Sequence, residues 1–130
     1  MNIRCWNDVL HLLCIMILLD GNVDEQEIDV FADAAISLRD KIDPNLVLTE
    51  HMARDWFAGH RDKIVLSIRP SCYESTVRRT LNRLDAIDNK DELIFALLKV
   101  AMSDGAKRPS DKKLLRSACE TWGMDLKLVA

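Results

Sequence analysis

Two long apolar runs dominate the chain, one from Val9 to Leu19 and one from Leu93 to Met102. Each run is followed by an Asp-Gly pair, and an amphipathic segment with helical spacing begins a few positions later. Segments that are apolar around most of their circumference are typical of helices buried on several sides. The pattern therefore predicts an all-α protein in which these two runs form central helices.

The same periodicity predicts a single compact bundle of about seven helices. Glycine, proline and Asp-Asn positions mark the breaks between them. The predicted helices cover residues 5–19, 24–38, 46–58, 61–68, 71–86, 91–103 and 109–121. No linker or low-complexity stretch divides the chain, so we expect residues 1–130 to form one domain.

The apolar faces of these helices also predict a core. The positions expected to be largely buried are Leu13, Ile17, Phe31, Leu97, Val100, Ala101 and Leu115. Glycines 21 and 105 end the two apolar runs, so both are expected at positive φ. Gly123 is expected to end the last helix.

The chain contains an internal repeat. The turns at Asp20 and Asp104 lie 84 positions apart. The same offset aligns apolar positions of the following segments: Val30 with Leu114, Phe31 with Leu115, and Ala34 with Ala118. A shared register of helix, turn and helix predicts an internal helix-turn-helix duplication.

Composition narrows the class of protein. With 48% hydrophobic and 30% charged residues, the chain is typical of a globular protein rather than a disordered one. A net charge of −3 disfavours nucleic-acid binding, which favours a basic surface. The four cysteines show no C-x-x-C spacing, so free thiols and a cytoplasmic location are expected. The run from Val9 to Leu19 is too short for a membrane span, so we do not expect the chain to be an integral membrane protein.

An acidic cluster follows the first turn. It contains no basic residue and consists of Asp20, Asp24, Glu25, Glu27 and Asp29. Clustered carboxylates favour hard cations such as Ca²⁺, Mg²⁺ or Mn²⁺. In the alternative interpretation, Asp24 and Glu27 only cap the next helix as a capping box. The cluster is no EF-hand, because Glu25 and Phe31 occupy its glycine and glutamate positions. Both interpretations stay open.

The other residues give weaker evidence for a functional site. The three histidines and four cysteines lack zinc-ligand spacing, and nothing suggests an organic cofactor. His11 is expected to be a satisfied core histidine. The pair Trp56-Phe57 is interpreted either as core or as an anchor for a partner. A basic stretch is interpreted as a solvated helix face or as a contact for phosphate or an acidic lipid surface. It consists of Lys107, Arg108, Lys112, Lys113 and Arg116.

Three features of the sequence resemble a known family. The first is the motif Asp20-Gly21-x-Val23-Asp24-x-x-Glu27 after an apolar helix, and the second is the turn at Asp104-Gly105. The third is Asp43-Pro44 followed by Trp56-Phe57-x-x-His60. Together they resemble the TerB-like (tellurite resistance protein B) family over roughly residues 8–124. The resemblance implies an all-helical bacterial domain associated with stress and tellurite resistance, whose turns bind divalent metal through acidic residues.

In this chain the acidic positions of that family correspond to Asp20, Asp24, Glu27, Asp104 and Asp111. The second turn departs from the first, because lysine and arginine at 107 and 108 replace valine and aspartate at the matching positions. Basic side chains beside a carboxylate already neutralise part of its charge. We therefore expect at most one divalent site, weaker than in relatives with two acidic turns.

The sequence supports two functional hypotheses. The first is a non-enzymatic domain that binds a divalent cation weakly, docks protein partners through its acidic Asp-Gly turns, or does both. These partners could include membrane-associated proteins. The alternative is a small all-helical metal-dependent nucleotide hydrolase. Its only support is the pair of motifs Asp24-x-x-Glu27 and Asp88-x-x-Asp91.

Overall fold

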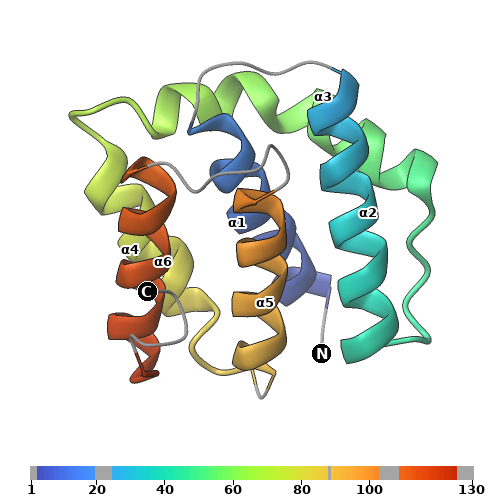
Figure 1. The fold of residues 1–130 in the computed structure, drawn as a ribbon. Coiled ribbons are helices and arrows are strands. Elements are labelled where there is room, and N and C mark those ends of the chain that lie inside the picture. The colour runs from blue at the N-terminus through green and yellow to red at the C-terminus, as the bar shows by residue number, and fades with distance from the viewer. Residues whose placement is uncertain (1–2, 20–24, 88, 103–108, 126–130) are drawn as a thin grey trace.

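The computed structural model describes residues 3–19, 25–87, 89–102 and 109–125 (Figure 1). Within these ranges the chain forms six α-helices and no strand, which confirms the predicted all-α class. The helices are α1 (Ile3–Leu18), α2 (Glu25–Ile42), α3 (Glu50–Ser67), α4 (Tyr73–Arg83), α5 (Lys90–Ala101) and α6 (Pro109–Trp122).

Helix α1 forms the centre of the bundle. Every side chain from Leu12 to Leu18 is at most 5% exposed, so this part of the helix has no solvent-facing side. It packs against four other helices, namely α2, α3, α4 and α5 (Figure 1). A helix whose side chains are apolar on every side is expected to be buried on every side, and this part of α1 is.

The remaining helices close around α1. Helix α5 packs against α1, α2 and α6, and α4 packs against α6. The Trp122 indole N–H donates a buried hydrogen bond of 2.9 Å to the Leu81 carbonyl oxygen, which fixes α6 against α4. All seven positions predicted for the core are buried, so that prediction is confirmed.

One predicted break is absent. The segments 46–58 and 61–68, expected to be two helices, form the single helix α3, which passes through Gly59. Glycine inside a helix costs about 1 kcal/mol relative to alanine. Phe57 and Ile64 lie on the buried face on either side of Gly59, and burying each contributes about 1.5–3 kcal/mol. Tertiary burial therefore outweighs the local preference for a break.

Helix ends also differ from the prediction. Helix α3 begins at Glu50 rather than at 46, because the Thr49 hydroxyl accepts a hydrogen bond from the Met52 N–H and caps the helix. Helix α2 continues to Ile42 instead of ending near residue 38. Gly123 ends α6 as predicted, at φ +66°, and the Met124 N–H donates to the Cys119 carbonyl oxygen. Glycines 21 and 105 lie outside the described residues.

Candidate functional site

Two of the predicted metal ligands lie in the described part of the chain, and both are turned inward. Glu27 belongs to the first turn of α2, and its Oε2 atom is buried. Asp111 belongs to the first turn of α6 and is 6% exposed. The other three, aspartates 20, 24 and 104, lie outside the described residues.

These two carboxylates occupy equivalent positions in the proposed repeat, 84 residues apart. Figure 1 shows that α2 and α6 begin at the same end of the bundle, where α1 and α5 end. Most apolar positions aligned by this offset are buried in both halves, namely Phe31, Ala34, Leu114, Leu115 and Ala118, whereas Val30 is partly exposed. This burial pattern agrees with a duplication, which itself stays a prediction.

The described residues do not complete a metal site. Among them, no group of three or more histidine, cysteine, aspartate or glutamate side chains is arranged to hold an ion. Of the two motifs of the hydrolase hypothesis, the structure describes Glu27 and Asp91, and these two carboxylates do not meet. Asp91 is exposed at the start of α5, at the opposite end of the bundle from Glu27 (Figure 1).

The thiols that the structure describes divide into core and surface groups. Cys14 and Cys119 are buried, and burial raises the pKa of Cys14 to about 12, so its thiol stays neutral and apolar. Cys72 is partly exposed, and the side chains of Arg69 and Ser71 lower the pKa of its thiol. All three are free thiols, as predicted.

An aromatic stack links α2 to α3. The Trp56 ring stacks on His60 with centroids 4.1 Å apart and on Phe31 at 5.9 Å. The Trp56 indole N–H donates a hydrogen bond of 3.0 Å to Asn7 Oδ1 on α1. The i,i+4 spacing of Trp56 and His60 was the sequence signal for this stack. The contacts with α1 and α2 needed the structure.

His11 differs from the prediction of a satisfied core histidine. Its Nε2 atom is buried and has no hydrogen-bond partner among the described residues. Burial is the main cause that lowers its pKa from 6.5. Asp8 opposes this shift, while His60 and Arg83 add to it. Helix α1 therefore carries His11 Nε2, as it does Trp6 Nε1, without a hydrogen-bond partner among the described residues and at a cost in folding free energy.

We expect stability to fall when the pH drops through 6.5. The unfolded chain protonates His11 more readily than the folded chain does, so the contribution of neutral His11 is fully present above pH 6.5. It is lost progressively toward the lower folded-state pKa. Urea unfolding at about pH 7.5 and about pH 5.5 would measure this dependence, and His11→Gln should reduce it. His51→Gln, at an exposed site, is the control; an equal reduction there would contradict the assignment to His11.

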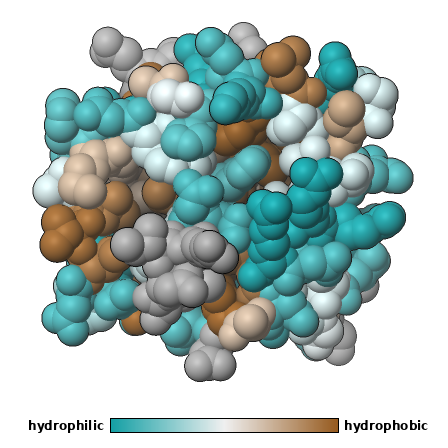
Figure 2. Space-filling model, turned by 180° about the vertical axis from the view of Figure 1, so that it is seen from behind, coloured by the Kyte–Doolittle hydropathy of each residue, from teal (hydrophilic) through white to brown (hydrophobic). Residues whose placement is uncertain are grey.

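A largely apolar groove of about 580 Å³ lies between α1, the 43–49 connection and α3. Its apolar walls are Trp6, Leu10, Leu46, Val47, Met52 and Trp56. Val47 is 75% exposed and Met52 is 44% exposed. In Figure 2 hydrophobic surface gathers on the left, the side on which the 43–49 connection lies. We call this feature the α1–α3 groove.

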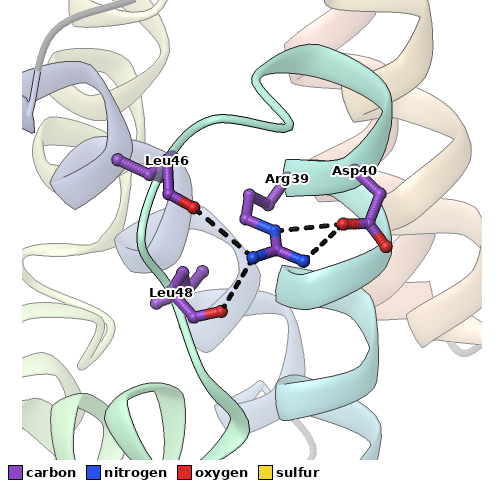
Figure 3. A network of polar contacts seen from close by, with 4 residues as sticks. All are labelled: Arg39, Asp40, Leu46 and Leu48. Carbon is purple, nitrogen blue, oxygen red and sulfur yellow. Dashed lines mark hydrogen bonds and ion pairs between the residues drawn. The ribbon is translucent and has the colours of Figure 1, made fainter.

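One side chain from α2 fixes the wall of this groove (Figure 3). Arg39 donates hydrogen bonds of 3.4 Å to the Leu46 carbonyl oxygen and 3.3 Å to the Leu48 carbonyl oxygen. Its Nε also donates to Asp40 Oδ1 at 3.0 Å, which orients the guanidinium group. The segment predicted as the start of a helix is therefore a non-helical wall attached to α2.

The three tryptophans are core or groove residues. Trp6 and Trp122 are buried, and Trp56 lines the groove. In the basic stretch, Lys113 lies over the Tyr73 ring, with its Nζ 5.0 Å from the centroid, and Lys112 is exposed. None of the described helices has the length and apolar character of a membrane span.

Comparison with known proteins agrees with this architecture. The family model described as "Tellurite resistance protein TerB" matches residues 7–127. No curated protein and no solved structure matches the chain. Because the family match covers nearly the whole sequence, the chain belongs to the TerB family.

Proposed function

We propose that this TerB domain is non-enzymatic and binds one divalent cation weakly at the end of the bundle where α2 and α6 begin. The observation that supports this proposal is the inward burial of Glu27 Oε2 and Asp111 at equivalent repeat positions. Carboxylates that point into the bundle rather than into solvent can serve as oxygen ligands of a cation held there. Helix capping alone does not require this burial, because a solvent-exposed carboxylate can cap a helix equally well.

The donor chemistry fits a hard cation. Ca²⁺ takes six to eight oxygen ligands and Mg²⁺ takes six, in both cases mainly from carboxylates, carbonyls and water. Glu27 and Asp111 would supply two of these groups, with Asp20, Asp24 and Asp104 as further donors from the turns. Lys107 and Arg108 in the second turn would weaken the site by neutralising part of the acidic charge.

A bound cation would also give this end of the bundle a role in docking. A cation bound by carboxylates from both turns would hold the turns together, so the metal would favour one arrangement of the turn surface. We propose that this surface contacts a protein partner in a stress or tellurite-resistance response. The partner would then bind more tightly in the presence of the metal than in its absence.

We expect Ca²⁺, Mg²⁺ or Mn²⁺ to stabilise the protein against unfolding. At a tenfold excess of free metal over Kd the gain is about 1.4 kcal/mol. Glu27→Gln and Asp111→Asn should each reduce this gain and weaken binding in calorimetric titration. Asp62→Asn, which removes an exposed carboxylate of α3, is the matched control and should behave like the unmodified protein.

A double variant tests whether the two basic residues of the second turn weaken metal binding. Lys107→Val with Arg108→Asp restores the residues of the first turn in the second and should tighten metal binding. Two equal sites in the unmodified protein would contradict a single weakened site. If neither the unmodified protein nor the double variant is stabilised by any of the three cations, the metal proposal is wrong.

A further inference from the structure

We infer that the α1–α3 groove binds a segment of a partner protein that carries apolar anchor side chains flanked by lysine or arginine. This surface is formed by other residues than the carboxylates proposed to bind metal, so the inference does not depend on that proposal. Large apolar patches on a monomer are associated with interaction sites. The groove contains two tryptophans and a methionine, and aromatic residues and methionine are enriched at protein interfaces.

The groove is held in shape before any partner arrives. Arg39 fixes the backbone of the 43–49 connection through two carbonyl oxygens. Asn7 accepts the Trp56 indole N–H, and the same indole is stacked on Phe31 and His60. A preorganised surface loses little conformational entropy on binding, which favours affinity. Val47 and Met52 remain exposed on this fixed frame.

Charge identifies the kind of partner. Among the described residues that line the groove, Asp43 is the one that carries a charge, and no lysine or arginine lines it. An apolar surface with a carboxylate at its edge complements apolar side chains next to a cation. An acidic lipid surface would require basic residues instead. Symmetric pairing with a second copy would bring the two Asp43 carboxylates to one interface, which like-charge repulsion disfavours.

The three tryptophans provide a direct assay. In ¹H–¹⁵N spectra the indole N–H signals of Trp6 and Trp56 report on the groove, while Trp122, bonded to Leu81, is an internal control. The probes are synthetic peptides with leucines at i, i+4 and i+7 or at alternating positions, each made with flanking lysines and with flanking glutamates. We expect the lysine peptides to shift the Trp56 and Trp6 signals and to leave Trp122 in place.

Surface variants link the signal to the groove. Val47→Arg and Met52→Lys should each weaken binding of the lysine peptide by about tenfold or more, as loss of an interface anchor does. Leu66→Arg, at a 61% exposed position of α3 outside the groove, is the matched control and should bind normally. Asp43→Asn should reduce the preference for lysine over glutamate peptides. Because Val47 and Met52 are exposed, these changes should leave folding intact.

Several outcomes would overturn the inference. One is equal binding of lysine and glutamate peptides. Another is binding by Val47→Arg as tight as that of the unmodified protein, and a third is no shift of Trp56 with any peptide at millimolar concentration. If light scattering shows a dimer that Val47→Arg converts to a monomer, a second copy occupies the groove. Val47-dependent binding to vesicles rich in anionic lipid, without peptide binding, would assign the groove to a membrane.

Discussion

Phe31→Ala is expected to lower the free energy of unfolding by about 3–5 kcal/mol, the range for truncating a buried phenylalanine. Phe31 is fully buried. Its ring lies 5.1 Å from Phe57, tilted by 54°, and 5.9 Å from Trp56. Removing the ring leaves a cavity between α2 and α3 and takes one partner from the stack beside the groove. Denaturant unfolding followed by circular dichroism would measure the loss.

Phe31→Leu is the matched control, because it keeps most of the apolar volume. It should cost below about 1.5 kcal/mol, as swaps of similar volume usually do. Trp56 fluorescence adds a second readout, since the stack in which it takes part is disturbed more by alanine than by leucine. A loss for Phe31→Ala no larger than that for Phe31→Leu would show that the aromatic cluster does not hold α2 against α3.

Leu97→Ala should destabilise the protein by about 2–5 kcal/mol. Leu97 is fully buried on α5, a helix that packs against α1, α2 and α6 at once. Such a crowded site collapses poorly around a cavity, which places the expected cost in the upper part of that range. Denaturant unfolding of the purified variant is the measurement.

Phe95→Ala on the same helix provides the comparison. Phe95 is 49% exposed, so its truncation should cost much less than that of Leu97. The pair separates the effect of packing from the effect of a substitution in α5 as such. A loss below about half a kcal/mol for Leu97→Ala would mean that α5 does not complete the core.

The sequence was sufficient to predict the class of fold and the core, because these depend on local periodicity. A run that is apolar all round is stable only inside a bundle, and the run from Val9 to Leu19 was found there as α1. The run from Leu93 to Met102 is buried at Leu93, Ile94, Leu97, Val100 and Ala101, but it leaves Phe95 and Met102 about half exposed. Gly59 shows the limit of such reasoning: its intrinsic preference predicted a break, but burial of Phe57 and Ile64 on the two sides keeps α3 continuous. That burial depends on α1 and α2, which no local window contains.

The candidate sites were predictable to different degrees. Acidic residues after a turn are visible in the sequence, and the inward orientation of Asp111 is compatible with that prediction. The α1–α3 groove was not visible, because its walls come from residues 6–10 and 43–56, which lie far apart in the sequence. Leu46 and Val47 resemble the start of a helix. In the structure they are not helical, and Arg39 holds this connection through carbonyl oxygens seven and nine residues further along the chain.

The central place of α1 has a consequence for biosynthesis. All four helices that cover it, α2 to α5, follow it in the chain, so the most apolar helix leaves the ribosome before any of its partners. Until α5 has been made, a strip of apolar side chains stays exposed to the crowded cell. The contacts between α1 and α5 therefore form only after most of the chain has been made, and apolar surface exposed until then favours aggregation of nascent chains. A chaperone that shields short apolar helices should therefore raise the yield of this protein more than its modest size suggests.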